Sequence, residues 1–380
     1  MAITELFIPF SATVHPSMLM QIGEAKTPFP FSSPNIRYYY FARNAIWQTV
    51  KRLGLDKGEV LAPAYHHGIE IDALLAGGAQ VKFYRLGLKW EVDLEDVEKK
   101  INTNTTALYL THFNGFPGPV HEMRRLADKY QLPLIEDCAL ALLSRNNDDM
   151  PLGLSGDISI FCIYKFIPVP NGGAMVINNP DYRNIAEPPP PPFSSTLSVL
   201  SSSLLRNFAL RGGRAGRRLR KLFLGLGKKI LRVSRIEPIM FGTQNLNPDH
   251  LNLGISSLSK HIVQAQNYSQ ISAKRRRNYL FLLEHLREIS APLFDHLPTG
   301  VVPLYYPFLV DDNRTMVERL EAQGIEAVAV WPSFHPNCDP AEFSEVARLR
   351  KTILELPCHQ DLTLEKMATI VTAVRTAVRY

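Results

Sequence analysis

Cysteine is scarce in this chain, which has four cysteines among 380 residues. Cys138, Cys162, Cys338 and Cys358 form no Cys-x-x-Cys pair, so their spacing indicates neither a zinc site nor a disulfide framework. Asp-x-Asp clusters are missing too, and we predict no metal site. Two of the cysteines lie within apolar runs, which is typical of free thiols in a reducing compartment.

The sequence also lacks long apolar runs. No stretch reaches the roughly 20 apolar residues that a membrane-spanning helix requires. No basic segment followed by an apolar one opens the chain, so we expect no export signal and a cytoplasmic location. The hydrophobic content of 46% and charged content of 21% are typical of a protein with a large buried core. The length predicts about two domains.

Acidic residues are absent from residues 188–236, where 11 lysines and arginines occur. The net charge of +6 for the whole chain therefore arises from this one insert. It opens with a stiff proline spacer at 188–192, and a basic amphipathic pattern follows within 206–235. Several glycines within it disfavour one long helix.

Three interpretations of this insert remain open. Its helix could pack on the protein's own core, lie on an anionic membrane surface, or attract a diphosphate or an acidic partner. Nucleic acid is not predicted as a partner, because no recognised binding motif accompanies the charge.

Helical and strand patterns alternate in the first half. The pattern predicts helices at 42–53, 68–77, 93–101 and 120–130, and strands at 59–63, 80–85, 107–111, 132–136 and 158–165. Such alternation favours an α/β fold with a mostly parallel sheet flanked by helices. In the last third we predict one long helix at 258–286, strands near 305–309 and 326–329, and a final helix capped by Thr363.

Lys165 ends the apolar run that begins at Ile158, and the prolines and glycines of 168–173 stop regular structure after it. A lysine at the end of a buried strand is costly unless its charge is paired, lost or used. A neutral amine can attack a carbonyl group to form a Schiff base. The alternative is a lysine whose amine merely reaches the surface.

Asp137 ends another short apolar run, at 132–136. In open parallel sheets, ligands bind beyond the carboxyl ends of the strands, so Asp137 and Lys165 are expected to face one crevice. A pyridoxal phosphate (PLP) site needs such a pair, because the carboxylate keeps the ring nitrogen protonated and the lysine holds the aldehyde. The alternative for Asp137 is a helix N-cap.

The order and spacing of six stretches resemble the DegT/DnrJ/EryC1/StrS family. The stretches are 41–46, 58–67, 111–117, Leu-Ile-Glu-Asp-Cys at 134–138, 153–173 and 356–363. The resemblance covers about 38–176 and the chain from about 252 onward. It implies a fold type I PLP-dependent transferase, with an N-terminal arm at 1–35, a large PLP-binding domain at 36–186, the insert at 187–250, and a long helix with a small C-terminal α/β domain at 251–380.

The resemblance also implies roles for individual residues at the cofactor. Lys165 would hold the PLP aldehyde, Asp137 would pair with the pyridine nitrogen, and His67 would stack on the ring. Arg43 and Asn44 would lie at the phosphate, where a helix start favours an anion. Cys162 stands near the cofactor, at a position where relatives commonly have serine.

Asn252 matches an asparagine that in relatives reaches the phosphate of the neighbouring subunit, which implies a homodimer. The implied activity is transfer of an amino group from an amino acid to a keto sugar carried on a nucleotide, as in polysaccharide biosynthesis.

Some positions depart from the family pattern. Leu140 stands where relatives commonly carry a histidine or glutamine, and Gly254 where an arginine is expected. A catalytically altered or non-catalytic PLP-fold protein is therefore one alternative. Another PLP reaction on a sugar, such as deoxygenation, is a second alternative, although relatives of that kind replace the lysine by histidine.

Further residues are weaker candidates. The run 275–277 is expected to be a solvated helix face, and His112 and His121 are expected to be structural. Trp331, Phe334 and His335 follow a predicted strand and are candidates for lining a sugar pocket.

Overall fold

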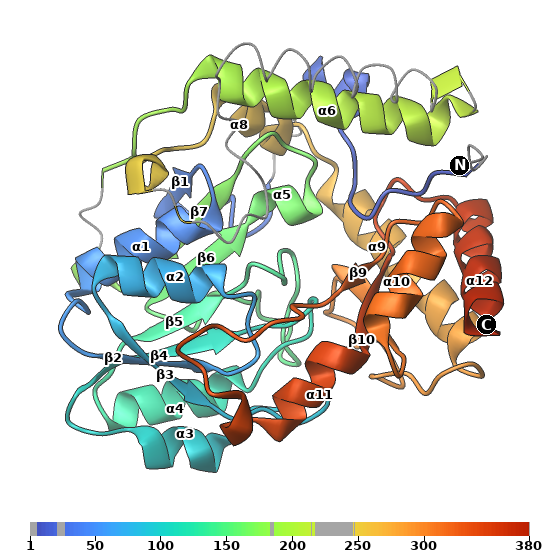
Figure 1. Cartoon of the computed structure of the whole chain (residues 1–380). Coiled ribbons are helices and arrows are strands. Elements are labelled where there is room, and N and C mark those ends of the chain that lie inside the picture. The colour runs from blue at the N-terminus through green and yellow to red at the C-terminus, as the bar shows by residue number, and fades with distance from the viewer. Residues whose placement is uncertain are drawn as a thin grey trace.

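The computed structural model describes residues 6–20, 27–182, 186–213, 215–216, 246 and 248–379. A large domain built on one sheet and a smaller domain built on another lie side by side, and helix α6 (Phe193–Arg211) runs across the top of both (Figure 1). Among these residues, no helix has both the length and the apolar character to cross a membrane.

The large sheet has seven strands in the order β1-β7-β6-β5-β4-β2-β3. Their bounds are β1 Ile36–Tyr39, β2 Glu59–Pro63, β3 Gln80–Tyr84, β4 Thr105–Thr111, β5 Leu134–Asp137, β6 Ile158–Cys162 and β7 Gly173–Ile177. The strands from β3 to β6 are parallel, whereas β7 and β1 add antiparallel pairs at one side. The predicted mostly parallel sheet is confirmed, and β1 and β7 are strands that the sequence patterns missed.

Helices cover both faces of this sheet. Helices α1 (Ala42–Leu53) and α2 (Ile69–Gly77) lie on one face, and α3 (Leu94–Lys100) and α4 (Val120–Lys129) lie on the other (Figure 1). This placement follows from right-handed crossovers between parallel strands. The chain moves outward from β2 to β3 and then back to β4 and β5, and this reversal puts the connecting helices on the opposite face. The four helices predicted here are confirmed to within two residues at each end.

The small domain contains an antiparallel sheet in the order β8-β10-β9, with β8 Tyr305–Leu309, β9 Val328–Ala329 and β10 Ile353–Pro357. Its helices are α9 Tyr268–Leu286, α10 Asn313–Ala322, α11 Ser344–Thr352 and α12 Leu364–Val378. Thr363 caps α12 as predicted, since its side chain accepts from the Lys366 amide. Short 3-10 helices occur at Pro16–Leu19, Pro180–Tyr182, Pro248–His250 and Pro340–Glu342.

The single long helix predicted at 258–286 is wrong. The structure has α8 (Ser257–Gln264) and then α9, separated at residues 265–267. Asn267 starts α9, because its side chain accepts a 2.9 Å hydrogen bond from the Gln270 amide. A side-chain cap of this kind satisfies an amide that the preceding turn would otherwise bond, and it ends one helix as it begins the next.

The strand predicted to end at Lys165 is also shorter than expected. Strand β6 ends at Cys162, and residues 163–166 form the single helical turn α5 (Ile163–Phe166). The Ile163 amide donates to the Gly172 carbonyl, which closes the loop from α5 to β7. Strand β7 then starts at Gly173, where a Cβ atom would lie 2.2 Å from the Phe41 carbonyl carbon. Only glycine permits β7 to approach the start of α1 this closely.

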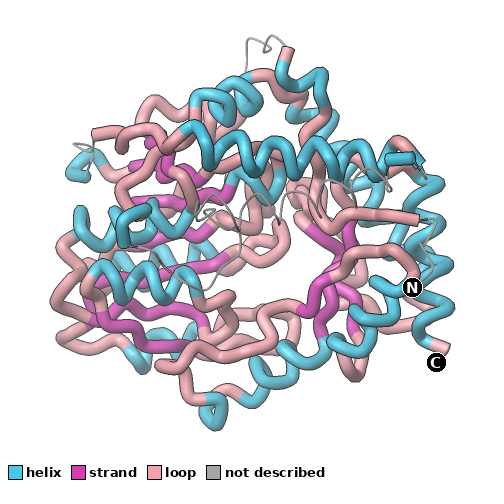
Figure 2. Tube along the Cα trace, turned by 45° about the horizontal axis from the view of Figure 1, so that its top comes forward, coloured by secondary structure: helices cyan, strands magenta, loops and turns pink. Residues whose placement is uncertain are grey.

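Helix α6 is part of the insert and crosses over both domains (Figure 2). Ser203 accepts a 2.9 Å hydrogen bond from the Val14 amide, and Asn207 donates one of 2.9 Å to Thr13. Arg206 forms an ion pair with Glu326 of the small domain. Most of the basic segment predicted within 206–235 lies outside the described residues.

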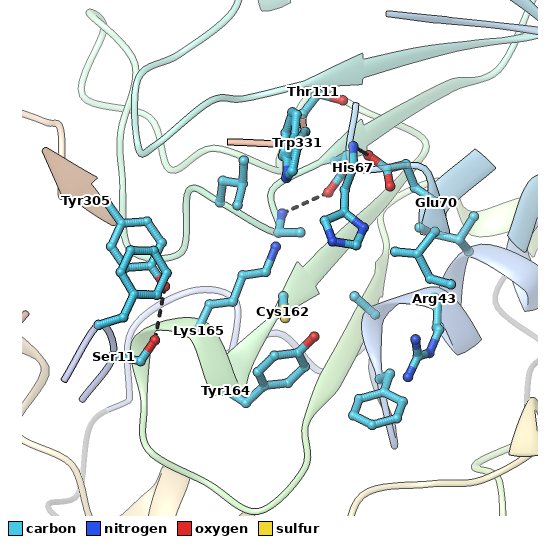
Figure 3. Close-up of a pocket in the computed structure, with 18 residues that line it drawn as sticks. Ser11, Arg43, His67, Glu70, Thr111, Cys162, Tyr164, Lys165, Tyr305 and Trp331 are labelled. Atoms are coloured by element: carbon cyan, nitrogen blue, oxygen red, sulfur yellow. Dashed lines mark hydrogen bonds between the residues drawn. The ribbon is translucent and has the colours of Figure 1, made fainter. Parts of the chain in front are cut away.

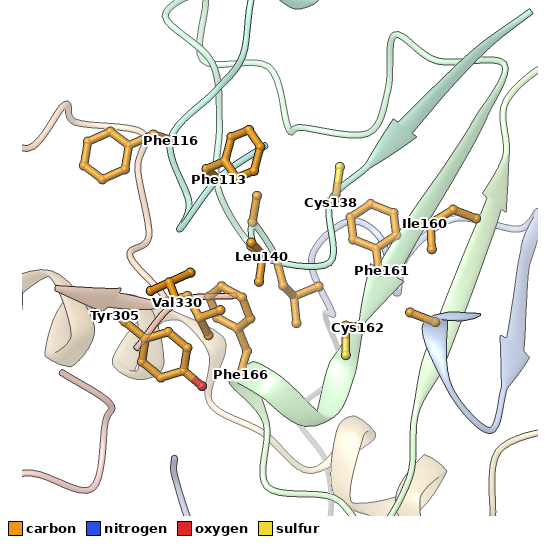
Figure 4. Close-up of a cluster of buried hydrophobic side chains, with 14 of the residues drawn as sticks. Phe113, Phe116, Cys138, Leu140, Ile160, Phe161, Cys162, Phe166, Tyr305 and Val330 are labelled. Carbon is orange, nitrogen blue, oxygen red and sulfur yellow. The ribbon is translucent and has the colours of Figure 1, made fainter. Parts of the chain in front are cut away.

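Apolar packing joins the two domains beneath the cavity described below. Figure 4 shows Cys138, Leu140 and Phe161 of the large domain in a buried cluster with Val330 and Tyr305 of the small domain. The walls of the site are therefore parts of the core.

Candidate active site

A cavity of about 360 Å³ opens where the large sheet meets the small domain (Figure 3). Thr111, Asp137 and Cys162 line it from the carboxyl ends of β4, β5 and β6. Arg43 lines it from the start of α1, and Trp331 from the small domain. The crevice that the parallel-strand pattern predicted is therefore present.

Lys165 projects into this cavity from α5, between Tyr305 on one side and His67 on the other (Figure 3). Its side chain is half-buried, and its amine forms no hydrogen bond or ion pair with any residue that the structure describes. The turn that carries it is held from below, because Arg275 and Gln360 donate to the Phe166 carbonyl at 3.2 and 2.8 Å. The backbone of Lys165 is thus fixed and its amine is left available.

Asp137 is 4% exposed and forms a buried end of the cavity. The Tyr109 hydroxyl donates to Oδ2 at 2.8 Å, and the Ala139 amide donates to Oδ1 at 2.8 Å. Burial raises the pKa of Asp137, the negative charge of Glu70 raises it further, and the two hydrogen bonds and Lys165 only partly offset this. A positive group in the cavity would stabilise the ionised carboxylate.

His67 follows β2 and lines the same cavity. Burial, together with the charges of Lys165 and Arg43, lowers the pKa of His67 to about 4, so the ring is neutral at pH 7. Its Nδ1 atom is buried without a hydrogen-bond partner in the described part of the chain. The His67 amide donates to Glu70 at 2.8 Å, which fixes the backbone here.

The start of α1 forms the wall around Arg43. The N-cap residue Phe41 makes no side-chain capping bond, and the Asn44 amide donates to the Phe41 carbonyl at 3.1 Å. The positive end of the helix dipole at this start favours an anion. The Arg43 guanidinium lies 4.1 Å above the Phe41 ring. Burial lowers the pKa of Arg43, while Tyr164 and Cys162 oppose that shift.

The structure does not support a cofactor role for the side chain of Asn44. Asn44 is buried away from the cavity wall, and its amide donates to the carbonyls of His250 and Leu251 at 2.6 and 3.1 Å. Both amide hydrogens are therefore used to hold the segment at 250–251 against α1.

Cys162 and Leu140 both line the cavity. Burial raises the pKa of the Cys162 thiol, so this group is a neutral weak donor. Leu140 adds only apolar surface where relatives were expected to carry a polar group.

Gly254 lacks room for the arginine that the family pattern led us to expect. Its amide donates to the Pro189 carbonyl at 2.6 Å, and a Cβ atom would lie 2.6 Å from the Pro188 oxygen. The proline spacer of the insert therefore occupies this space. Asn252 is exposed, accepts from Gln48 at 3.4 Å and does not line the cavity of its own chain, so its role toward a neighbouring subunit stays a prediction.

Trp331 lines the cavity as predicted, whereas Phe334 and His335 do not. Phe334 lies 4.4 Å from the Arg350 guanidinium, and His335 pairs with Asp72. His112 bonds Glu136 at 3.3 Å inside the core, which confirms its structural role. His121 pairs with Asp148 at 2.7 Å on an exposed surface.

Other site residues escaped the sequence patterns. Glu70 and Tyr109 face Asp137, and Glu355 lines an adjoining cavity of about 300 Å³ that shares Lys165. Arg275 corrects the expected solvated face, because it is fully buried and donates to backbone carbonyls on α5 and before β8. Of these residues, only Glu70 could have been noticed in the local sequence, because an acidic residue in the first turn of a helix is favourable.

These side chains suit PLP. An unbonded amine, a buried carboxylate and an unpartnered imidazole nitrogen line one cavity, and a helix start with an arginine lines its wall. Lys165 would meet the aldehyde of PLP, Asp137 the ring nitrogen and His67 the ring face. The start of α1 with Arg43 would meet the phosphate. Among the described residues, no group of three or more side chains could hold a metal ion.

Comparisons with known proteins agree with this geometry. The model of the DegT/DnrJ/EryC1/StrS aminotransferase family, which is PLP-dependent, matches residues 44–234. GDP-perosamine synthase of Vibrio cholerae is 32% identical over 140 residues, which cover 36% of this chain and 38% of that protein. The match to this curated relative thus spans well under half of its length.

Two solved structures show the same fold. Helicobacter pylori PseC, an aminotransferase involved in the biosynthesis of pseudoaminic acid, has a TM-score of 0.68 at 16% identity, covering 98% of this chain and 100% of PseC. NtdA of Bacillus subtilis, solved with bound cofactor PMP, has a TM-score of 0.60 at 17% identity, covering 91% and 73%. The chain belongs to the DegT/DnrJ/EryC1/StrS aminotransferase family.

Proposed function

We propose that this protein is a PLP-dependent aminotransferase that moves an amino group from an amino acid to a keto sugar carried on a nucleotide. The observation that carries the proposal is the unbonded amine of Lys165 in the same cavity as the buried carboxylate of Asp137. The family match and a relative named GDP-perosamine synthase support the reaction class and the substrate class.

Bound PLP supplies an aldehyde that condenses with amines and a ring that accepts electrons. Lys165 provides the amine that holds the cofactor, and its Nζ then carries a proton to and from the substrate carbon. Asp137 keeps negative charge at the buried end of the cavity, where Tyr109 and the Ala139 amide fix both carboxylate oxygens.

The remaining walls position the reactants. The neutral ring of His67 offers a flat face, and the first turn of α1 with Arg43 binds the phosphate. Phe10 and Tyr305 are stacked at 4.0 Å between ring centres, and with Trp331 they give the substrate side an aromatic wall. Such surfaces bind the apolar face of a sugar and exclude water from the reacting atoms.

Some expectations about partners and place also stay proposals. Asn252 is proposed to reach the cofactor phosphate of a second copy, which makes the active form a homodimer. The cytoplasmic location and the contact of 206–235 with an anionic membrane surface rest on the sequence pattern alone.

The half-reaction with an amino donor tests the proposal. Purified protein with PLP should convert L-glutamate to 2-oxoglutarate in one turnover per chain and then aminate one member of a panel of keto sugars linked to GDP, UDP or dTDP. A Lys165→Ala variant with the same melting temperature should do neither.

Two other outcomes would replace the proposal. If PLP binds but no amino donor reacts, a different PLP reaction on a sugar is favoured. If PLP does not bind, the alternative of a non-catalytic protein is favoured. The apolar Leu140, which lines the cavity and cannot donate a hydrogen bond, would then account for the lack of binding.

A further inference from the structure

Glu355 is a buried acid that no step of the proposed reaction uses. It lies in β10 of the small domain and is 7% exposed. It lines the adjoining cavity of about 300 Å³ together with Lys165, and the other walls include the apolar side chains of Leu140, Val330 and Trp331. A carboxylate in such surroundings is expensive unless a positive or hydrogen-bonding group faces it.

A contact between the domains fixes the position of this carboxylate. Asn114, which follows β4 in the large domain, donates a 2.8 Å hydrogen bond to Oε1 of Glu355. Asn114 itself has a φ of 49°, and its carbonyl accepts from the Leu304 amide at 3.2 Å. Among the described residues, the Glu355 carboxylate accepts a hydrogen bond from Asn114 at Oε1, and its Oε2 accepts none. This second oxygen can therefore interact with groups in the cavity.

Lys165 is the cation that shares this cavity with Glu355. The charge of Lys165 favours the ionised form of Glu355, although the two groups are too far apart to form an ion pair. Their attraction acts across an interior with few polar groups, where a charge is poorly screened.

We infer that Glu355 is a positioning residue of the active site: its carboxylate, held by Asn114, attracts the Lys165 side chain toward the small domain and so limits how readily the amine reacts with a carbonyl group. The inference deepens the proposed function, since it names a group that controls the lysine on which the proposed transfer depends.

The influence of Glu355 depends on pH. Burial raises the pKa of Glu355 to about 7, against the opposing effects of Asn114 and Lys165. The carboxylate is therefore charged above about pH 7 and neutral below it, so its hold on Lys165 is present at pH 9 and absent at pH 6. Other titratable groups interact electrostatically with the pair. His67, Glu70, Asp137 and Cys162 are influenced by the charge of Lys165, and Tyr65, Tyr305 and Cys358 by that of Glu355.

Labelling of Lys165 in the full-length chain tests the inference. The protein is freed of PLP with hydroxylamine, treated with trace acetic anhydride from pH 6 to pH 9, and mapped by peptide mass spectrometry. Because removing the negative charge of residue 355 releases the Lys165 side chain, Glu355→Gln should raise labelling of Lys165 roughly threefold to tenfold at pH 9 and leave it unchanged at pH 6, where Glu355 is already neutral.

Matched variants separate charge from structure. Glu355→Asp keeps the charge and should restore labelling toward that of the wild type. Glu342→Gln removes an exposed acid of the same domain and should change nothing. Asn114→Gly suits the positive φ but removes the hydrogen-bond donor to Glu355. The pKa of Glu355 should therefore rise, and Lys165 labelling should fall below that of Glu355→Gln only above a higher pH than in the wild type.

Equal labelling of Lys165 in the wild type and Glu355→Gln at every pH, or no labelling at Lys165, would overturn the inference. If Glu355→Gln does not fold, the shifted pH response of Asn114→Gly decides. Because the labelling is done without PLP, a negative result leaves the amino-donor assay standing. A failure of PLP to bind likewise leaves the labelling result readable.

Discussion

The hydroxyl of Tyr109 donates a 2.8 Å hydrogen bond to Oδ2 of Asp137 at the buried end of the cavity. This bond favours the ionised carboxylate, which burial and the charge of Glu70 disfavour. In the register of the neighbouring strands β4 and β5, Thr111 lies beside Asp137 and Tyr109 lies beside Ile135, so the Tyr109 side chain reaches Asp137 diagonally on the same face of the sheet.

Replacing Tyr109 by phenylalanine should shift the acid side of the pH profile. Without the hydroxyl the pKa of Asp137 rises further, so a larger fraction is protonated at low pH. We expect transamination by Tyr109→Phe to fall by roughly tenfold at pH 6 and less at pH 8.5, measured as single-turnover 2-oxoglutarate release.

Tyr84→Phe is the control for this change, since the buried Tyr84 hydroxyl donates to the Tyr109 carbonyl at 2.9 Å rather than to the carboxylate. Parallel pH profiles for the two variants would contradict the assigned role of Tyr109.

Arg275 should be essential to the stability of the junction between the domains. Its guanidinium donates to the carbonyls of Leu304 and Phe166 at 2.8 and 3.2 Å and lies 4.7 Å from the Phe166 ring. Arg275→Met leaves these buried carbonyls without a donor, so we expect a loss of about 3 kcal/mol in unfolding free energy, measured by urea denaturation. Lys274→Met, one position earlier in α9, should cost less than about 0.5 kcal/mol.

Glu136 makes part of the stability depend on pH. It accepts from the amides of Gly153, Ser155 and Gly156 and pairs with His112. Burial alone would raise the pKa of Glu136, but His112 and the backbone amides outweigh it, so the pKa is lowered. The stabilisation is therefore present above the unfolded pKa of about 4.5 and is lost as pH falls through the lower folded value.

Glu136→Gln should be less stable at pH 7 by about 2 kcal/mol and should lose less stability between pH 5 and pH 3 than the wild type. Melting temperatures across this range check the prediction. Glu95→Gln, at an exposed position, should keep the slope of the wild type. An unchanged slope in Glu136→Gln would show that other acids govern the response.

Restoring a side chain at Gly254 should displace the proline spacer. The Cβ of Gly254→Ala would meet the backbone oxygens of Pro188 and Pro189 at 2.6 and 3.1 Å. Since backbone cannot move aside as a flexible side chain can, we expect a loss of about 1–3 kcal/mol by thermal denaturation. At Gly87 the nearest atom is the end of the Glu91 side chain, so Gly87→Ala should be nearly neutral.

The parts of the site that could be predicted from the sequence lie at the ends of predicted strands. Asp137 ends a predicted strand, and parallel strands bring their carboxyl ends to one edge, whereas His67 was predicted from the family resemblance. Lys165 was placed in the right crevice, although a helical turn rather than a strand carries it. Hydrophobic periodicity was enough for this, because it reports which segments are buried.

The parts that could not be predicted depend on contacts between distant segments. Arg275 is part of a basic run that resembles a solvated face, yet its acceptors come from residues 165–166 and 303–304. The carboxylate of Glu355 is held in position by Asn114, which lies 241 residues away in the sequence. Asn44 satisfies the helix-start pattern, but its side chain is taken by residues 250–251.

Reduction of the PLP complex with borohydride tests the central claim most directly. The protein is mixed with equimolar PLP, reduced, digested and mapped by mass spectrometry. We predict one pyridoxyl group per chain on Lys165, a much weaker adduct in Asp137→Asn, and none at this position in Lys165→Ala. Pyridoxyl groups spread over exposed lysines such as Lys51 and Lys57, with Lys165 unmodified, would contradict the account.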